Sequence, residues 1–284
     1  NLMAIEMDFW FTETINDTVG NTIKVRERIF GGRSDYQKIE IVDTYHYGRT
    51  LILDGSIQLT EKDEFTYHEM ISHIPLFTHP HPEHVLVIGG GDGGTVREVM
   101  KHPTVSRAKL VEIDPLVIEK SKQFLPFVSC EMDNPRVEVI IQDGIQYVKS
   151  HTGMFDVILI DSTDPVGPAV GLYQKEFFKD VHKALKDDGI MVAQSASPFF
   201  DEHIVRKLYA TLKPLFPIRK MYLAPVPSYP SGFWSFALCS KKYDPPLDNR
   251  CEDLRRFNPN MRYYNEAIHQ AAFALPNLIQ ELIA

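Results

Sequence analysis

The sequence predicts an α/β protein in which a small N-terminal antiparallel β-sheet precedes a larger domain built on a parallel sheet. Up to about residue 60, apolar and polar side chains alternate, as they do in half-buried strands. Beyond residue 80, short apolar runs of strand type alternate with segments of helical period, as a parallel sheet with crossover helices requires. We therefore expect a β-strand domain over residues 1–62 and an α/β domain over residues 63–284.

The first domain shows its strands as alternating runs. These runs cover residues 23–26, 37–42, 49–53 and 56–60. Asp54-Gly55 separates the last two, and Asp-Gly between two strands is a strong hairpin signal. An antiparallel sheet follows from this spacing.

The pattern changes near residue 64, where apolar side chains recur at helical spacing from Glu64 to Phe77. Pro75, Pro80 and Pro82 then interrupt the chain. Beyond them, we predict strands over 84–88, 109–113, 137–141, 155–160, 190–194 and 233–239, and helices over 95–102, 115–124 and 175–186, with Asp188-Gly189 as the turn after the last helix.

Composition excludes several classes of protein. The formal net charge of −8 disfavours nucleic-acid binding, which needs clustered Lys and Arg, and suits a cationic ligand better. No apolar run is long enough to cross a bilayer. The start of the chain lacks a basic segment followed by an apolar one, so we expect no signal peptide and a cytoplasmic protein. Asn1 and Leu2 precede a methionine and carry no weight in the fold prediction.

Metal and disulfide frameworks are not expected. Cys130, Cys239 and Cys251 are odd in number and widely spaced, which favours reduced thiols. His79-Pro80-His81-Pro82 resembles a ligand pair, but its prolines and loop setting make a poor site.

Glycines and carboxylates gather where three predicted strands end. The run from Gly89 to Gly94 lies between a strand and a helix, where glycine lets the backbone approach a ligand closely. Glu112 ends the next strand, twenty residues after Asp92, and an acidic residue there receives the ribose hydroxyls of a nucleoside. Asp143-Gly144 follows the third strand, where Asp can accept a hydrogen bond from the adenine amine, although the pair also suits a simple turn. Together they resemble an adenosyl site of the methyltransferase type.

Asp92 places a carboxylate inside the glycine loop. A fixed carboxylate there would repel the carboxylate of S-adenosylmethionine and attract its ammonium, so a ligand lacking its carboxylate is favoured. Such charge matching is worth on the order of 1–3 kcal/mol net. A helix-capping role for Asp92 is compatible with this one.

Asp161 and Asp164 follow the strand over 155–160 in the run from Asp161 to Pro168, whose prolines and glycine would let it act as a lid. The pair can serve amine chemistry. A primary amine has a pKa of about 10.4 and arrives protonated, so one carboxylate can accept its proton while the other holds it in line. An Asx turn with a capping Asp is the structural alternative.

Four runs then identify a family resemblance. Tyr67-His68-Glu69-Met70, Gly89 to Gly94, Asp161 to Pro168 and Pro227 to Gly232 resemble spermidine synthases, the bacterial type most closely. The resemblance covers nearly the whole chain, from Trp10 to Pro276.

The resemblance implies a small N-terminal β-domain and a Rossmann-like catalytic domain of methyltransferase type. It implies that decarboxylated S-adenosylmethionine, or the product methylthioadenosine, is held by Gln37, His68, Asp92, Glu112, Asp143, Gly144 and Pro168. Asp161 would accept the proton and Asp164 would anchor a diamine, with Tyr67, Gln194, Tyr229 and Gln58 along or near its groove. No metal or other cofactor is expected, since the sulfonium compound is a co-substrate. The family also implies a homodimer or homotetramer.

Putrescine is the acceptor that we expect, giving spermidine and methylthioadenosine. Agmatine, cadaverine or spermidine would need only a change in groove length, and one methylene discriminates weakly. Two other classes stay open. One is a small-molecule methyltransferase on the same fold, which would have to accept the methionine carboxylate beside Asp92. The other is a polyamine-binding protein without catalytic activity.

Overall fold

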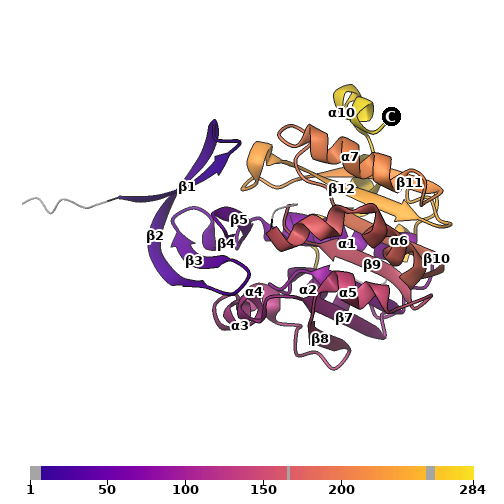
Figure 1. The fold of residues 1–284 in the computed structure, drawn as a ribbon, viewed down its shortest axis with the longest axis horizontal. Coiled ribbons are helices and arrows are strands. Elements are labelled where there is room, and N and C mark those ends of the chain that lie inside the picture. Colours follow the sequence, from indigo (N-terminus) through magenta and orange to yellow (C-terminus); the bar gives the residue numbers. More distant parts are fainter. Residues whose placement is uncertain (1–7, 165–166, 254–259) are drawn as a thin grey trace, which may run out of the picture.

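Five antiparallel strands form the N-terminal sheet of the computed structural model, which describes residues 8–164, 167–253 and 260–284 (Figure 1). They are β1 (Phe9–Ile15), β2 (Val19–Arg33), β3 (Lys38–Thr44), β4 (Gly48–Leu53) and β5 (Ser56–Thr60), adjacent in chain order. The predicted hairpin is confirmed, because Asp54 and Gly55 both take positive φ angles of 47° and 88° between β4 and β5. The edge strand β1 was not predicted.

A seven-stranded mixed sheet forms the larger domain, in the order β11-β12-β10-β9-β6-β7-β8. Its strands are β6 (His84–Gly89), β7 (Arg107–Glu112), β8 (Val137–Ile141), β9 (Phe155–Asp161), β10 (Leu185–Gln194), β11 (Ile218–Pro225) and β12 (Phe233–Ser240). The parallel arrangement expected from the sequence holds from β8 to β10. It does not extend to β12, which runs antiparallel to both β10 and β11.

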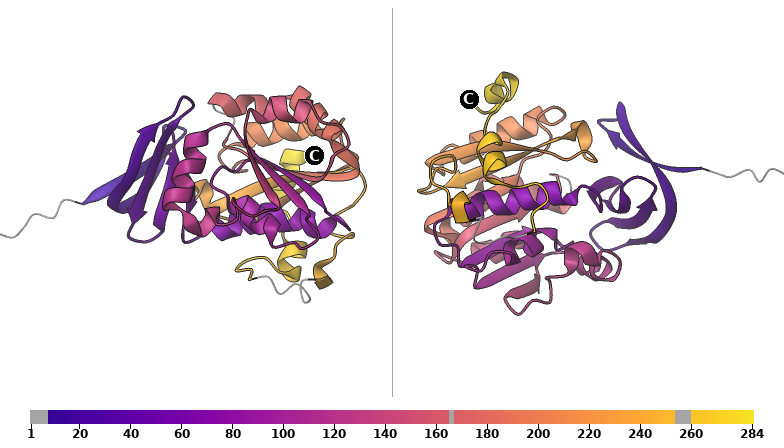
Figure 2. Two further views of the ribbon diagram at one scale, coloured as in Figure 1. Left: turned by 90° about the horizontal axis from the view of Figure 1, so that it is seen from below. Right: turned by 180° about the vertical axis from the view of Figure 1, so that it is seen from behind.

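Helices cover both faces of this sheet (Figure 2). They are α1 (Glu64–Thr78), α2 (Gly94–Met100), α3 (Pro115–Phe124), α4 (Pro126–Ser129), α5 (Gly144–Lys149), α6 (Lys175–Ala184), α7 (Glu202–Leu212), α9 (Glu266–Ala271) and α10 (Asn277–Ile283), with 3₁₀ turns η1 (Gly167–Tyr173), η2 (Pro230–Gly232) and η3 (Cys251–Asp253). Side chains of the central strands alternate between two cores: Val85 and Val87 face one, and Leu86 and Ile88 the other.

Two sequence predictions need correction. The helix predicted from Glu64 to Phe77 is confirmed as α1, but Pro75 lies inside it and does not interrupt the chain, because Ile74, Leu76 and Phe77 around it are completely buried. The helix predicted to reach Lys186 ends at Ala184. Leu185 already pairs with Phe155 of β9, so β10 begins there and contains the predicted turn as an irregularity.

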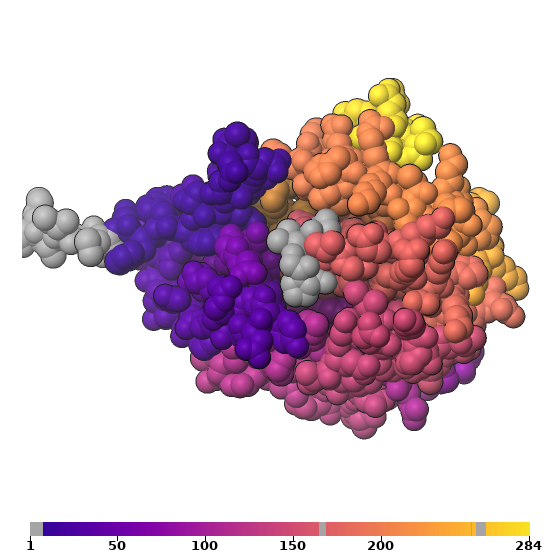
Figure 3. All heavy atoms as spheres, viewed as in Figure 1, coloured from indigo at the N-terminus to yellow at the C-terminus, as the bar shows by residue number. Residues whose placement is uncertain are grey.

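A hydrophobic cluster joins the N-terminal sheet to the larger domain. Ile39, Ile41 and Leu51 of the N-terminal sheet pack against Val117, Leu125 and Val128 of the α3–α4 segment. The space-filling view shows the two domains in contact along one side of the molecule (Figure 3). The predicted division after residue 62 falls between the end of β5 and the start of α1, and it stays a prediction.

The structure bears on two further expectations. Over residues 8–164, 167–253 and 260–284, no helix combines the length and the apolar character needed to span a bilayer. Cys130 is an exposed free thiol and Cys239 a buried one, whereas the side chain of Cys251 lies outside the described residues.

Candidate functional site

The strand order reverses at β6, whose neighbours are β7 on one side and β9 on the other. Open α/β sheets bind ligands at such a switch point, outside the carboxyl ends of the strands. The glycine loop follows β6, Glu112 ends β7, Asp143 follows β8, and Asp161 ends β9. The predicted carboxylates therefore meet at one edge because their strands run in parallel.

One large cavity lies at this edge and against the N-terminal sheet. It is lined by the predicted residues Gln37, Gln58, Tyr67, His68, Asp92, Glu112, Asp143, Gly144, Asp161, Asp164, Gln194 and Tyr229. It is also lined by Glu13 and Trp234, which were not predicted. Pro168 lies in η1 with its side chain outside the described residues, as do positions 165 and 166 of the predicted lid. The structure places the residues together, and their roles stay predictions.

The glycine loop is built for close approach. Gly89 and Gly90 have positive φ angles of 79° and 66°, and Gly90 N–H donates to the carbonyl of Asp161 at 2.8 Å. A Cβ on Gly91 would lie 2.8–3.0 Å from the Glu112 side chain. Glycine at these positions therefore lets the loop lie directly against both carboxylate-bearing strand ends.

Glu112 lines the end of the cavity that is predicted to hold a nucleoside, and its carboxylate is hydrogen-bonded to the backbone of Asp114. Glu112 Oε1 accepts the N–H of Asp114 at 2.9 Å, and Asp114 Oδ2 accepts from Gln37 Nε2 at 2.9 Å and from Ser34 Oγ at 2.6 Å. Burial, with the charges of Asp114 and Asp92, raises the pKa of Glu112 to about 7. Gln37 thus reaches this end from the N-terminal sheet through Asp114, a link that the sequence did not reveal.

Asp143 caps α5. Its Oδ1 accepts the N–H of Ile145 at 2.8 Å, and Gly144 follows as the first residue of the helix. A Cβ on Gly144 would lie 2.4 Å from Ile88 Cγ2 of β6. The pair therefore marks a strand-to-helix corner at the cavity wall rather than a free turn.

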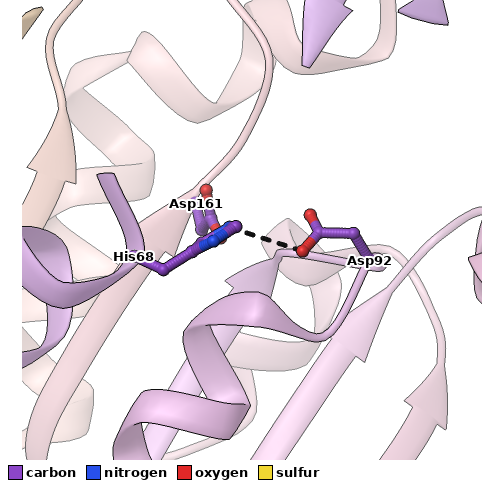
Figure 4. A group of neighbouring side chains, drawn as sticks. All are labelled: His68, Asp92 and Asp161. Atoms are coloured by element: carbon purple, nitrogen blue, oxygen red, sulfur yellow. Dashed lines mark ion pairs between the residues drawn. The ribbon is translucent and has the colours of Figure 1, made fainter. Parts of the chain in front are cut away.

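His68 lies between the carboxylates of Glu64 and Asp92, and Figure 4 shows its ring with Asp92 and Asp161. Its Nδ1 lies 2.6 Å from Glu64 Oε2, and its Nε2 lies 3.4 Å from Asp92 Oδ1. Asp92 Oδ1 also accepts the N–H of Gly94 at 2.7 Å. The carboxylates of Asp92 and Glu64 outweigh the opposing effect of burial and raise the pKa of His68 to about 10. The imidazolium in turn holds the pKa of Asp92 below its ordinary value.

Asp161 is held by two hydroxyl groups. Tyr67 Oη donates to its Oδ1 at 2.7 Å, and Thr95 Oγ1 donates to its Oδ2 at 2.6 Å. Burial, together with the charge of Asp92, raises the pKa of Asp161 above its ordinary value although both donors oppose the rise. A carboxylate that is oriented and more basic than usual is suited to accept a proton.

Asp164 and Gln194 lie farther along the acidic loop. Gln194 Nε2 donates to Asp164 Oδ1 at 3.3 Å, to the carbonyl of Ser162 at 3.0 Å and to Tyr173 Oη at 2.7 Å. Burial, with the charge of Asp201, raises the pKa of Asp164 to about 6. Gln194 therefore ties the acidic loop to the end of β10.

Aromatic rings and a buried carboxylate complete this part of the cavity. The Tyr229 ring lies 5.9 Å from that of Tyr67 and 4.7 Å from that of Trp234, and its hydroxyl donates to the carbonyl of Gln58. Glu13 of β1 is buried, and its Oε1 accepts the N–H of Ile57 at 3.2 Å. Its Oε2 has no hydrogen-bond partner among the residues that the structure describes. The sequence signal that could have identified Glu13 is the alternation of β1, which places this residue on the buried side of the strand.

Two groups of side chains in the described part of the chain bring metal-type donor atoms within 4.8 Å of one another: His68 with Asp92 and Asp161, and His79 with Asp156 and Asp188. The second group is a poor metal site. His79 Nδ1 accepts the N–H of His81, so the neutral ring carries its proton on Nε2, the atom that faces the carboxylates. Lys186 already neutralises Asp156 at 2.8 Å.

Family models match two parts of the chain. The "Spermidine synthase tetramerisation domain" matches residues 9–61, and the "Spermine/spermidine synthase domain" matches residues 64–249. Full-length relatives are also similar. A polyamine aminopropyltransferase of Caldicellulosiruptor bescii is 51% identical over 98% of this chain and 99% of its own, and one of Bacillus subtilis is 48% identical over 97% and 99%.

Solved structures agree with these matches. A spermidine synthase in complex with the transition-state analogue AdoDATO superposes with a TM-score of 0.95 at 44% identity, covering 97% of this chain and 94% of that one. The spermidine synthase of Thermotoga maritima superposes with a TM-score of 0.92 at 43% identity, with the same coverage.

Proposed function

The chain belongs to the spermidine synthase family of polyamine aminopropyltransferases, and from that premise we propose that it transfers the aminopropyl group of decarboxylated S-adenosylmethionine to putrescine. The products are spermidine and methylthioadenosine. One observation carries the proposal for this chain: Asp161 lies in the same cavity as Asp92 and the nucleoside-end Glu112 on one side and Asp164 on the other. The proton acceptor therefore stands where a sulfonium and an amine would meet.

The sulfonium substrate fits the glycine-loop half. Glu112 receives the ribose hydroxyls, Asp143 and Gly144 adjoin the adenine, and Gln37 closes this end from the N-terminal sheet. Asp92 and His68 face the aminopropyl end. Because Asp92 is partly buried and anionic, it attracts the terminal ammonium and would repel a carboxylate at the same place.

The reaction is an in-line displacement. The amine nitrogen attacks the aminopropyl carbon beside the sulfonium, the N–C bond forms, and the C–S bond breaks with its electron pair passing to sulfur. Asp161 accepts the proton from the amine, since its oxygens are already oriented by Tyr67 and Thr95. We also propose that no resident metal takes part, because the sulfonium becomes a neutral thioether and needs no further activation as a leaving group.

The acceptor amine fits the other half. Glu13 is buried and Asp164 is partly buried, the charge of Asp164 acts on Glu13, and together they suit the second ammonium of a diamine. The rings of Tyr67, Tyr229 and Trp234 flank the methylene chain and favour a cation.

Assembly forms part of the proposal. The family model that matches residues 9–61 is named for tetramerisation. In this chain β1 is an edge strand, and its Phe9 and Trp10 are 61% and 57% exposed. We propose that copies of the chain associate through this sheet.

An assay of products over a panel of amines tests the acceptor. With decarboxylated S-adenosylmethionine, we expect putrescine to give the highest kcat/KM, and cadaverine, one methylene longer, to fall by about 10–200-fold. A higher value for agmatine or spermidine would overturn putrescine and leave the reaction intact. Methyl transfer from intact S-adenosylmethionine, without methylthioadenosine from its decarboxylated form, would overturn the reaction itself.

The variant Glu13→Gln is expected to have two effects, one on the stability of the protein and one on the binding of the acceptor amine. Burial, to which the charge of Asp164 adds, raises the pKa of Glu13 from 4.5 to about 7, so its contribution to stability is present at low pH and lost as the pH rises through 7. The neutral amide is therefore expected to raise Tm at pH 8 by about 2–4 °C, or roughly 1 kcal/mol, with little change at pH 5. The KM for putrescine at pH 8 should rise about tenfold, because a charged partner is lost.

Thermal melts and initial rates at both pH values check this prediction. The KM for decarboxylated S-adenosylmethionine serves as the internal control, since Glu13 lies at the acceptor end. An unchanged KM for putrescine would remove Glu13 from the acceptor site.

A further inference from the structure

A chain of alternating charges leads from a second pocket, which Glu64 and Arg97 line, to the glycine loop. Arg97 of α2 donates to both oxygens of Glu64, from Nη1 to Oε1 at 2.9 Å and from Nη2 to Oε2 at 2.8 Å. Glu64 Oε2 lies 2.6 Å from His68 Nδ1, and His68 Nε2 lies 3.4 Å from Asp92. Only the last two members of this chain line the large cavity; Glu64 and Arg97 lie behind it.

Because these side chains are largely shielded from water, the neighbours of each charged group decide how well its charge is compensated. The side chains of Glu64 and His68 are 4% and 3% exposed, and that of Arg97 is 15% exposed. Each buried charge is therefore compensated by its neighbours rather than by water. Arg97 is fixed further by Phe127, whose carbonyl accepts from Nη1 at 2.8 Å, and by Glu98, whose Oε1 accepts from Nε at 2.8 Å.

The glycine loop fixes the plane of the imidazole ring. A Cβ on Gly94 would lie 2.3–2.5 Å from three ring atoms of His68, so the ring packs against the bare backbone of the loop. Glu64 then fixes the rotation of the ring, because it accepts from Nδ1. With both constraints in place, Nε2 can point only toward Asp92.

We propose that Glu64 and Arg97 are positioning residues that keep a proton on His68 Nδ1 and direct its Nε2 at Asp92, so that Asp92 stays ionised and oriented for the ammonium of the sulfonium substrate. The part that concerns the substrate rests on the proposed function. The nitrogen that carries the proton in a histidine is set by the partner of the other nitrogen, which is the principle that this arrangement uses.

The charged groups of the described residues that act on His68 come from several elements. Glu64 lies on the same helix, Asp92 on the glycine loop and Asp161 at the end of β9, with Arg97 of α2 acting through Glu64. The two flanking carboxylates favour the imidazolium form of His68 against the cost of burial. Loss of Glu64 would remove one of them.

Glu64→Gln tests the proposal, since glutamine keeps the size of the side chain and removes its charge. NMR titration of the His68 ring is expected to show its pKa lowered by at least about one unit, which is tenfold in proton affinity. The KM for decarboxylated S-adenosylmethionine should rise by about 10–100-fold, most at alkaline pH, while the KM for putrescine changes less than about twofold.

Two further variants separate positioning from folding. Glu98→Gln changes an equally buried carboxylate that also accepts from Arg97 but does not contact His68, so it should lower Tm without moving the pKa of His68. The double variant Glu64→Gln/Arg97→Gln removes the whole Glu64–Arg97 ion pair and leaves Glu98 its ion pairs with His73 and Lys101, so it should keep the low pKa of His68 seen in Glu64→Gln.

The outcomes are distinct. An unchanged pKa of His68 in Glu64→Gln, or an equal rise in KM in Glu98→Gln, would overturn the proposal. A wild-type protein that forms no product with any amine would overturn the proposed function instead, and the His68 titration would still report on Glu64.

Discussion

Replacing Asp161 by asparagine is expected to lower turnover by about 10²–10⁴-fold while methylthioadenosine binding changes little. The amide keeps the shape of the carboxylate; its oxygen can accept from one of the Tyr67 and Thr95 hydroxyls, and its NH2 group can donate to the oxygen of the other, so the cavity wall should stay in place. It cannot take the proton of the attacking amine. The loss should therefore appear in kcat rather than in the binding of the nucleoside.

The pH dependence gives this prediction a second readout. Burial, with the nearby charge of Asp92, raises the pKa of Asp161, and only its ionised form can accept a proton. The kcat/KM of the wild type should therefore fall on the acid side as Asp161 becomes protonated, and this limb should be missing in Asp161→Asn. Stopped-time product assays from pH 5 to 9 and calorimetric titration with methylthioadenosine measure the two effects.

A matched control lies on the neighbouring strand. Asp187 is exposed near the start of β10, at the end of the sheet opposite the cavity, so Asp187→Asn should leave rates unchanged. Unchanged turnover in Asp161→Asn would remove Asp161 from its role as proton acceptor, whereas an absence of turnover in the wild type would favour a polyamine-binding protein without catalytic activity.

The residues that could be predicted from pattern alone share one property: each ends or follows a strand of strong apolar character. Glu112, Asp143 and Asp161 belong to this set, because parallel strands bring their carboxyl ends to one edge whatever the rest of the fold does. The glycine loop belongs to it too, since its close contacts are with these same strand ends.

Residues whose position depends on long-range packing could not be predicted in this way. Gln37 reaches the cavity through a bond to Asp114, 77 positions away, and only the family resemblance indicated it. Glu13 was missed because its place depends on the pairing of β1 with β2 and on its contact with Ile57. The link between Glu64 and Arg97 joins two helices, and helical period carries no information about it.

Two predictions failed for a related reason: that Pro75 interrupts the chain, and that the parallel arrangement extends to β12. Pro75 is a strong local signal against a helix, yet complete burial of the residues around it keeps α1 intact to Thr78. The direction of β12 is set by its pairing with β10 and β11, which its own sequence does not encode. Local propensity is a weak guide wherever tertiary packing decides.

Asp92→Asn is expected to weaken binding of decarboxylated S-adenosylmethionine by about 10–100-fold, which corresponds to about 1–3 kcal/mol for a buried charge pair. Asparagine can still accept the N–H of Gly94, so the loop should keep its shape. Intact S-adenosylmethionine should bind the variant better than it binds the wild type, because its carboxylate no longer meets a like charge. The ratio of the two binding constants should therefore fall, because the decarboxylated ligand binds more weakly and the intact ligand binds more tightly.

Asp92→Asn should also change the pH dependence of the reaction, which is an effect separate from ligand binding. Burial raises the pKa of Asp161 and the charge of Asp92 adds to this rise, so removing that charge should lower the pKa of Asp161. The acid limb of kcat/KM should then move to lower pH in Asp92→Asn. Calorimetry with both ligands and a pH–rate profile measure the two effects, with Asp133→Asn, an exposed carboxylate paired with Lys122, as the control. An unaltered preference for the decarboxylated ligand would mean that the shape of the cavity, and not Asp92, excludes the carboxylate.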